Sequence, residues 1–352
     1  SMIQLLESRS PGAEAELIEE LQILLNDDTG LFENIEAKKK LLASYTQRCR
    51  HRISGRRIAV RLSELAENLE RKADWLTGHL QNHEWIDGGT DEGWFNSYYD
   101  DHGRAVEGFF PNEVRMMLTG QVFSIMGNVA SEQQIRRIVN SADRYLYRKE
   151  IGGYRLNTDF HELKFDMGRM FGFAYGEKEN GAVFSHMTVM YANALYRRGF
   201  AKEGWKALKT LADTALDFDT SRIYPGIPEY FRSDGRGMYH YLTGAASWFM
   251  MTMITQVFGV RGQAGDLILA PQLMAEQFDE QGEASVSLVF AGKNLEIIYE
   301  NPNRKDSGTY TVFSAVCEGQ QLPTDDLGHV IITRRILDTL SDDCHRVIVK
   351  LI

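Results

Sequence analysis

The hydrophobic pattern of this chain changes its period once, near Val260. Before that point apolar residues recur at spacings of three and four, which is typical of amphipathic helices. After it, "ASVSLVFAGKNLEIIYENP" (284–302), "GTYTVFSAV" (308–316), "HVIITRRIL" (329–337) and "HRVIVKLI" (345–352) alternate apolar and polar residues. Such alternation indicates antiparallel strands with one buried face. The sequence therefore predicts a mainly α protein, with a helical body followed by a small antiparallel β domain.

The first third of the chain also has a helical pattern. The segments "GAEAELIEELQILL" (12–25) and "RRIAVRLSELAENLERKADWLTGHL" (56–80) place apolar residues among charges at helical spacing, with acids one turn from bases. We predict two amphipathic helices here. The resulting division is an N-terminal helical segment over 1–83, a second helical portion over 84–265 and a β domain over 266–352.

Composition excludes several classes of partner. The chain has 352 residues, 43% of them hydrophobic, which favours one or two domains. The net charge of −10, with Lys and Arg spread along the chain, argues against nucleic acid and anionic membranes as partners. No stretch is apolar enough to span a bilayer, and the first residues lack signal-peptide character, so we expect a cytoplasmic protein. Cys49, Cys317 and Cys344 have no CxxC spacing, and no Asp, Glu or His spacing suggests a metal or an organic cofactor.

Two long loops combine glycine, aromatic and charged residues. They are "EWIDGGTDEGWFNSYYDDHGRAVEG" (84–108) and "RIYPGIPEYFRSDGRGMYHYLTGAASW" (222–248). Aromatic faces beside carboxylates and amides suit sugar rings, which stack through their C–H faces and form directional hydrogen bonds through their hydroxyls. Equally, these aromatic side chains can simply close the ends of a helical barrel.

The segment "YGEKENGAVFSHM" (175–187) places three consecutive charges between two glycines. A helix is predicted from Ala182, with His186, Met190 and Asn193 on one face. A single histidine on an apolar helix is usually a satisfied core residue, and a charged triplet is usually a solvated loop. Charges buried at the mouth of a helical barrel, however, would need a polyhydroxylated or anionic ligand to avoid a cost of several kcal/mol.

Several ordered motifs resemble a known family. The segments "YGEKENGAVFSHMTVMYANAL", "RIYPGIPEYF", "GRGMYHYLTGAASW" and "VFGVRGQAGDLILAPQL", together with "DEGWFNSYYDDHGRAVEG", are similar to the C-terminal half of the inverting phosphorylases of glycoside hydrolase family 94. This family includes cellobiose, chitobiose and β-1,2-oligoglucan phosphorylases, and a related module ends the cyclic β-1,2-glucan synthases. The resemblance covers about residues 84–295, the last strands loosely and the first 80 residues hardly at all.

The resemblance implies a fold and a reaction. The fold is an (α/α)6 barrel, with residues 84–265 as its catalytic portion, followed by a small β domain. In the reaction, inorganic phosphate acts as co-substrate and attacks the anomeric carbon of a β-linked gluco-oligosaccharide, while one carboxylic acid protonates the leaving oxygen. The product is α-glucose 1-phosphate. Phosphate is already a nucleophilic anion, so no catalytic base is needed, whereas an inverting hydrolase needs a second carboxylate.

The resemblance also implies site residues. Phosphate would be bound by His186, Thr243 and the backbone N–H groups around Gly244, with Glu229 near the position of a family Gln or Glu. Lys178 and Glu179 would hold the hydroxyls of the donor glucose. The other substrate-binding positions are those of the segment with the Trp-Phe pair, and they are Trp94, Tyr99 and Asp100.

The family's general acid is missing from this pattern. It is an Asp in a Gly-Asp-Trp-Asn-Asp motif well before the Trp-Phe segment, where this chain has "LLNDDTGLF" (24–32), whose Asp27 and Asp28 have no neighbouring Trp. Asp87 in "EWIDGG" is better explained as a turn residue. Either the chain is the C-terminal part of a longer phosphorylase, or residues 1–84 replace the missing helices. The first explanation predicts exposed apolar barrel wall and self-association, and the family itself implies a homodimer.

Two other functions remain open. A hydrolase on the same barrel would need a second acid, for which Asp100, Asp101 and Glu107 are candidates. A non-catalytic remnant that binds glucan or a partner chain would fit the missing acid motif. Within the phosphorylases, "NSYYD" after the Trp-Phe pair and "GRGMYHYLTGAASW" favour the β-1,2-glucan enzymes.

Overall fold

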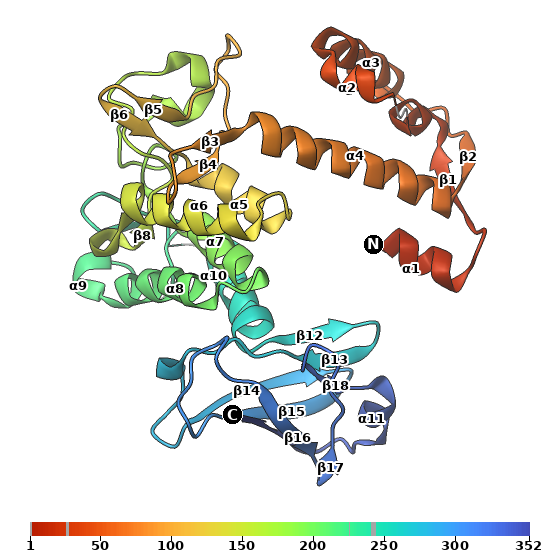
Figure 1. The fold of residues 1–352 in the computed structure, drawn as a ribbon, viewed down its shortest axis with the longest axis vertical. Coiled ribbons are helices and arrows are strands. Elements are labelled where there is room, and N and C mark those ends of the chain that lie inside the picture. The colour runs from red at the N-terminus through yellow and green to blue at the C-terminus, as the bar shows by residue number, and fades with distance from the viewer. Residues whose placement is uncertain (1, 26–27, 225, 241–243) are drawn as a thin grey trace. The chain divides into compact units, whose positions relative to one another are not determined.

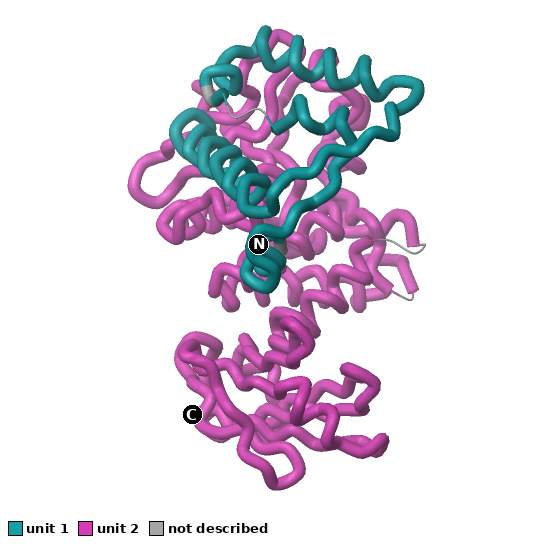
Figure 2. The backbone as a smooth tube through the Cα atoms, turned by 90° about the vertical axis from the view of Figure 1, so that its right-hand side faces the viewer, with its two compact units in different colours: residues 1–84 teal, residues 85–352 magenta. Residues whose placement is uncertain are grey.

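The computed structural model describes residues 2–25, 28–224, 226–240 and 244–352. The chain divides into two compact units, Ser1–Glu84 and Trp85–Ile352 (Figures 1 and 2). Each unit is described by itself.

Unit 1 contains helices and one two-stranded sheet. Its elements are α1 (Met2–Arg9), β1 (Glu14–Ile18), the 3-10 segment η1 (Glu19–Leu25), α2 (Thr29–Glu33), α3 (Ile35–Cys49), β2 (Arg57–Arg61) and α4 (Leu62–His83). The Asn34 side chain caps α3 by accepting a 3.0 Å hydrogen bond from the Ala37 N–H. Such a cap satisfies one of the N–H groups that a helix leaves unpaired at its start.

The helix predicted over 12–25 is wrong. Residues 14–18 form β1 and pair antiparallel with β2, and the 3-10 segment follows. In both strands charged and apolar residues alternate, so that the charged side chains are exposed and most of the apolar ones share the other face. A cross-strand ion pair of 2.9 Å between Arg57 and Glu16 supports the register. The second predicted helix is confirmed from Leu62 onward as α4.

Unit 2 contains the remaining helices of the described chain. They are α5 (Leu118–Met126), α6 (Glu132–Tyr145), α7 (Ser185–Arg197), α8 (Ala201–Leu216), α9 (Phe218–Ser221), α10 (Gly244–Thr252) and α11 (Arg334–Thr339), with a π-helical turn over Met253–Val257. Helix α7 contacts α5, α8 and α10, and most of its residues are buried (Figure 1). In α10, by contrast, Met250 and Met251 remain exposed while Ala245 is buried. Apolar surface is therefore exposed on one face of α10.

Several segments that have the sequence pattern of loops form short β-hairpins and small sheets. They are β3 (Trp85–Asp87) with β4 (Gly93–Phe95), β5 (Gly108–Phe110) with β6 (Glu113–Arg115), β7 (Tyr147–Arg148) with β8 (Gly153–Tyr154), and the three strands β9 (Val183–Phe184), β10 (Tyr230–Phe231) and β11 (Gly237–Met238). The helix predicted from Ala182 begins only at Ser185, because residues 183–184 pair with β10. This pairing joins the two segments that contain the predicted phosphate-binding residues.

The C-terminal strands confirm the predicted change of pattern. One sheet contains β12 (Val260–Gln263), β13 (Asp266–Leu269) and β18 (Val330–Ile332), and the other contains β14 (Glu283–Phe290), β15 (Lys293–Glu300), β19 (Cys344–Leu351), β16 (Val312–Cys317) and β17 (Gln320–Gln321). The expectation of purely antiparallel strands is wrong, since β15 and β19 run parallel. Parallel neighbours need a long connection, and here it includes β16, β17, β18 and α11. The segment 329–337, predicted as a strand, divides because Thr333 caps α11 through the Ile336 N–H.

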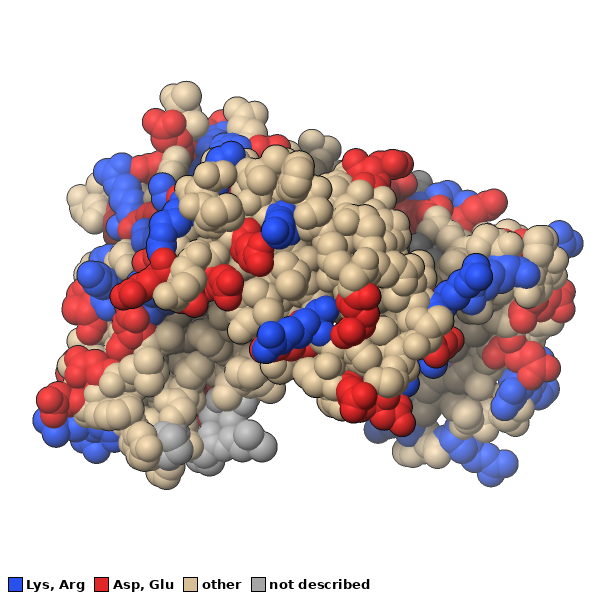
Figure 3. Space-filling view, turned by 90° about the horizontal axis from the view of Figure 1, so that it is seen from below, with Lys and Arg blue, Asp and Glu red and all other residues tan. Residues whose placement is uncertain are grey.

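Charges of both signs are interspersed on the face of the molecule drawn in Figure 3. In the described part of the chain, no helix has the length and apolar character that a membrane span requires.

Candidate phosphate and sugar site

His186 lies at the junction of β9, α7 and α10. It is the second residue of α7, and its ring centroid lies 5.9 Å from that of Phe184 and 5.7 Å from that of Trp248. Gly244, the first residue of α10, lies directly against the imidazole. A Cβ at this position would be 2.6 Å from His186 Cε1 and 2.7 Å from Nδ1. The glycine therefore allows the start of α10 to approach the histidine.

The imidazole has an unused polar atom. His186 Nε2 is buried, and among the described residues it has no hydrogen-bond partner. Burial lowers the pKa of His186, and the charge of Glu229 acts in the opposite direction more weakly. Buried polar atoms are normally paired, so an exception of this kind indicates a ligand or water position.

Glu229 is held by its backbone next to this ring. Its carbonyl accepts a 2.9 Å hydrogen bond from the Ser185 N–H, and its own N–H donates to Met238 and Tyr239 carbonyls at 3.1 Å. These bonds continue the β9–β10–β11 sheet into the first turn of α7. The sheet thus fixes Glu229 beside the residue that precedes His186.

The loop over 176–180 is a tight turn. The Gly176 N–H donates to the Asn180 carbonyl at 2.7 Å, and the Asn180 N–H donates to the Glu177 carbonyl at 3.0 Å. Lys178, at the tip, has a φ of 46°, in the left-handed region that non-glycine residues seldom adopt. Strain of this kind at a charged residue is common in functional loops.

Each charge of the Glu-Lys-Glu triplet has a distinct partner. The Lys178 ammonium lies 4.9 Å from the centre of the Phe173 ring and 5.3 Å from that of Tyr239, and a hydrogen bond with Tyr239 is the main cause of its raised pKa. Glu177 pairs with Arg232 at 3.0 Å, and Glu179 pairs with Arg169 at 3.3 Å. The other carboxylate oxygen of Glu179, Oε2, is buried and lacks a hydrogen-bond partner in the described part of the chain.

Tyr230 connects the loop to the histidine. Its ring stacks on Phe184 with centroids 4.7 Å apart, and Phe184 in turn contacts the His186 ring. Burial, followed by the charges of Glu179 and Glu229, raises the pKa of Tyr230. Lys178, Glu179, Glu229, His186 and Gly244 therefore gather around one small sheet, with two unpaired polar atoms, His186 Nε2 and Glu179 Oε2, among them.

Other predicted substrate residues lie elsewhere. Trp94 is 0% exposed and packs against Phe109 and Tyr145 at ring distances of 4.8 and 5.9 Å. Tyr99 is 51% exposed and forms an isolated β-bridge with Ala105. Thr243 lies outside the described residues.

The acids proposed for a hydrolase have structural partners. Asp100 accepts hydrogen bonds from the His102 N–H at 2.9 Å and the Arg104 N–H at 3.0 Å, and these bonds, together with the Arg104 guanidinium, lower its pKa to about 2. Glu107 accepts from the Ser97 and Met117 N–H groups, each at 2.7 Å. The Asp101 N–H donates to the Asp166 carbonyl at 3.0 Å, while its side chain is exposed.

Two aspartates considered for the general acid are also structural. Asp28 caps α2 by accepting from the Gly30 N–H at 3.0 Å. Asp87 accepts from the Gly89 N–H at 3.0 Å, which confirms its predicted turn. Asp27 is not among the described residues.

Sequence reasoning missed the residues that surround the triplet. Arg169, Phe173, Tyr230, Tyr239 and Trp248 contact the predicted residues, but they come from three separate segments. For Tyr230, Tyr239 and Trp248 the signal was the high aromatic content of the segment 222–248, and Arg169 and Phe173 lie outside it. Pairing across such distances in sequence is decided by tertiary packing.

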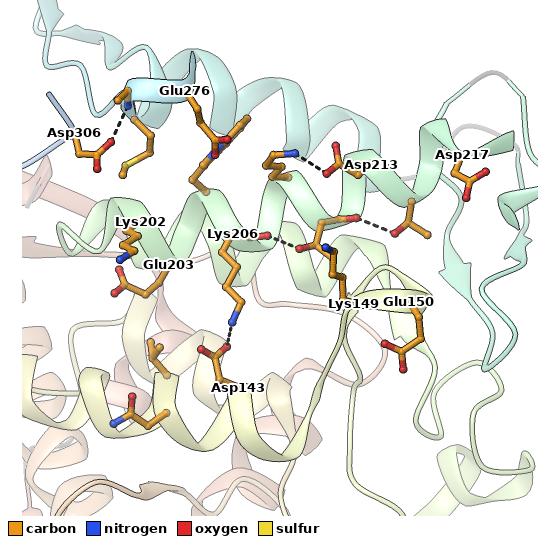
Figure 4. Close-up of a pocket in the computed structure, with 18 of the residues that line it drawn as sticks. Asp143, Lys149, Glu150, Lys202, Glu203, Lys206, Asp213, Asp217, Glu276 and Asp306 are labelled. Carbon is orange, nitrogen blue, oxygen red and sulfur yellow. Dashed lines mark hydrogen bonds and ion pairs between the residues drawn. The ribbon is translucent and has the colours of Figure 1, made fainter. Parts of the chain in front are cut away.

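A larger cavity in the described part of unit 2 has a wall that contains none of these site residues. A cavity of about 1270 Å³ lies between α6, α8 and residues 274–276 (Figure 4). Two of its lysines are paired, Lys206 with Asp143 at 2.8 Å and Lys209 with Asp213 at 2.6 Å. Across the described residues, no cluster of three or more His, Cys, Asp or Glu side chains is arranged to hold a metal ion.

Gly244→Ala is expected to weaken binding of inorganic phosphate about tenfold, because the new methyl group displaces the imidazole. The free energy of unfolding is expected to stay close to that of the parent, because alanine has a higher helix propensity than glycine. Isothermal titration calorimetry with phosphate measures the change. The matched control is Gly78→Ala in α4, where a Cβ meets nothing within 4 Å. If Gly244→Ala binds phosphate as tightly as the parent, Gly244 does not lie at the phosphate-binding position.

Comparison with known proteins identifies one family. Residues 58–259 match the family described as "Glycosyl hydrolase 94 superfamily, catalytic domain". The match begins nearer the N-terminus, and ends nearer Val260, than the motifs alone suggested.

Three curated relatives are similar over part of their length. A cellobionic acid phosphorylase from Neurospora crassa is 26% identical over 60% of this chain and 27% of its own length. A 3-O-beta-D-glucopyranosyl-beta-D-glucuronide phosphorylase and a solabiose phosphorylase, both from Paenibacillus borealis, are 24% and 23% identical over 71% and 62% of this chain, and over 32% and 29% of their own lengths. The chain thus spans about a third of the length of these relatives. Because the family match covers more than half of its residues, this chain belongs to the glycosyl hydrolase 94 superfamily.

Proposed function

We propose that this chain supplies the phosphate-binding and donor-sugar-binding part of an inverting glycoside phosphorylase. The observation that carries the proposal is the buried, unpaired Nε2 of His186 beside the first residue of α10. Helix starts present free N–H groups to anions, and the imidazole adds a further donor at the same place. The names of the relatives, all phosphorylases, support the same reaction class.

In this mechanism, His186 and the start of α10 hold the phosphate below the anomeric carbon. The imidazole is neutral in the empty site at neutral pH, because burial lowers its pKa. Bound phosphate would favour the protonated form, which makes a stronger charge-assisted hydrogen bond. The phosphate oxygen attacks the anomeric carbon, the glycosidic C–O bond breaks, and a general acid protonates the leaving oxygen. That acid is not among the residues of this site.

Donor-sugar binding is assigned to Lys178 and Glu179. The unpaired Oε2 of Glu179 is an acceptor for a sugar hydroxyl, and the Lys178 ammonium is a donor held between two aromatic rings. A donor and an acceptor at adjacent positions suit neighbouring hydroxyls of a pyranose. Phe184 and Tyr230, stacked on each other, provide a nearby apolar face.

The same proposal covers the division into domains, the substrate and the active assembly. The helices α5–α10 form the catalytic portion of an (α/α)6 barrel within residues 84–265, residues 266–352 form the β domain, and residues 1–83 form a separate segment. The substrate is a β-linked gluco-oligosaccharide, with inorganic phosphate as co-substrate and no other cofactor. The active assembly is a homodimer, or this chain joined to an N-terminal half that carries the general acid, and its place of action is the cytoplasm.

A second candidate is a non-catalytic module that binds glucan. It is favoured by one observation: the side chains of Asp28, Asp87, Asp100 and Glu107, four of the five described acids considered for catalysis, all have structural partners, and the fifth, Asp101, is exposed. If the protein is such a module, the site around His186 binds sugar and phosphate but catalyses no reaction.

Measuring the release of glucose 1-phosphate distinguishes a phosphorylase from a non-catalytic binding module. The protein is incubated with cellobiose and β-1,2-gluco-oligosaccharides, with and without phosphate, beside the His186→Ala variant. Phosphate-dependent product that is lost in the variant would establish phosphorolysis by these residues. No product, with phosphate still bound by calorimetry, would mean that the chain binds phosphate without the proton donor, as the binding module or as one part of a larger phosphorylase. Release of free glucose without added phosphate would overturn both and indicate a hydrolase, which transfers the glycosyl group to water.

A further inference from the structure

A second pocket, of about 620 Å³, lies in unit 2 and is rich in arginine. Its wall comes from the β5–β6 hairpin, the end of α6, and the segment after β8. The side chains on which the argument depends are Arg144, Arg148, Arg155, His161, Tyr145 and Tyr175. Lys178, Glu179 and His186 are not part of this wall, so the pocket is separate from the proposed phosphate and sugar site.

Two of its guanidinium groups lack a carboxylate partner. Arg155 is partly buried and donates to neutral oxygens only, the Gly181 carbonyl and, at 3.2 Å, the Ser233 hydroxyl. Arg148 donates to the Tyr147 carbonyl at 2.6 Å. Burial lowers the pKa of Arg155, and the nearby positive charge of Arg148 acts in the same direction. Two like charges are therefore held close together without an ion-pair partner among the described residues.

The carboxylates of the pocket are engaged elsewhere. Glu113 accepts from Arg115 Nε at 2.6 Å, and Asp159 accepts from the His161 N–H at 2.9 Å. The remaining arginine, Arg144, is paired with Glu92. Among the described residues, Arg148 and Arg155 form no hydrogen bond or ion pair with a carboxylate, and the charges of Glu150 and Asp159 only partly oppose the effect of burial on the pKa of Arg155, in a protein whose net charge is −10. A protein of this charge does not attract anions in general, so the concentration of arginine is a local property of the pocket.

Aromatic rings stand beside these charges. The Tyr175 ring centre lies 5.2 Å from the Arg155 guanidinium, and burial is the largest cause that raises the pKa of Tyr175. Burial also raises the pKa of Tyr145, to about 12, so both phenols stay neutral and can pack against an apolar face. Planar guanidinium groups match the geometry of carboxylate and phosphate oxygens, and aromatic faces match the C–H face of a pyranose. We propose that this pocket binds a sugar that carries an oxyanion, as a phosphate or a carboxylate.

Calorimetry with the whole 352-residue protein tests the proposal, using glucose 6-phosphate, glucuronate and glucose as probes. The titrations are made in the His186→Gln background, which weakens binding of phosphate groups at the other site, and the Arg148→Ala comparison assigns the remaining binding to this pocket. The anionic sugars are expected to bind at least about tenfold more tightly than glucose. Arg148→Ala is expected to weaken their binding about tenfold, since it removes one charge-assisted hydrogen bond from an exposed residue. The control, Arg136→Ala, removes an exposed arginine of α6 that pairs with Glu132 outside the pocket.

The outcomes separate cleanly. Binding of glucose 6-phosphate alone identifies a phosphate ligand, and binding of glucuronate alone identifies a carboxylate ligand. Equal affinity for glucose, no binding of either anionic sugar, or an Arg148→Ala variant that binds like the Arg136→Ala control would overturn the proposal. Inorganic phosphate affinity that is the same in the parent protein and in His186→Gln would refute the proposed function and leave this result unaffected.

Discussion

His186→Gln is expected to lower the affinity for inorganic phosphate by about 30-fold, because a hydrogen bond to a charged group contributes about 1.5–3 kcal/mol. Glutamine keeps a polar side chain but does not become cationic, so it cannot form the charge-assisted bond. Calorimetric titration with phosphate measures the change. The matched control is His102→Gln, an exposed histidine in the turn that Asp100 caps. If the variant binds phosphate as tightly as the parent, His186 does not contribute to phosphate binding.

The same variant has an expected pH signature. Burial lowers the pKa of His186 in the folded protein, below the value of about 6.5 that it has when unfolded. The unfolded chain then binds more protons, so the folded protein loses stability as the pH falls below that value. His186→Gln removes this contribution, so the parent should lose melting temperature relative to the variant as the pH falls from about 7 to 5. A difference in melting temperature that does not change with pH would contradict burial of a neutral imidazole.

Trp94→Ala is expected to destabilise the protein by about 3–5 kcal/mol while leaving phosphate affinity unchanged. The indole is 0% exposed and packs between Phe109 and Tyr145, so its loss leaves a cavity in the core. Chemical denaturation of the two proteins measures the difference. The matched variant Trp94→Phe should cost much less, because it keeps a ring, and because the indole Nε1 has no hydrogen-bond partner among the described residues.

This pair of variants also tests the substrate role that the family resemblance gives to Trp94. If Trp94→Ala folds with unchanged stability and loses sugar binding, the residue is a binding residue and not a core residue. If stability falls and phosphate still binds, its part in the site is to support the β3–β4 hairpin. The second outcome is the expected one, because a fully buried indole offers no surface to a sugar.

The strongly periodic elements were predictable from the sequence. Helix α4 beyond Leu62 and the strands β14, β15, β16 and β19 follow patterns of period 3.6 or 2 that neighbouring residues set by themselves. The secondary-structure predictions were wrong where the hydrophobic pattern extended over only a few residues. The segment 14–18 fits either period, and only its pairing with 57–61 makes it a strand. The parallel pairing of β15 with β19 likewise has no local signal.

The sequence by itself determined which residue types the candidate site offers: a histidine, a glycine and a Glu-Lys-Glu triplet, in an order that resembles one family. Only the tertiary structure decided which of these residues meet. Pairing of β9 with β10 places Glu229 beside the start of α7, and packing of α10 on α7 places Gly244 against His186. It also placed Trp94 in the core and left Arg148 and Arg155 without carboxylate partners in the described chain. The physical reason is that residue types fix which interactions are available, while burial and long-range packing fix which polar atoms find a partner and which remain for a ligand.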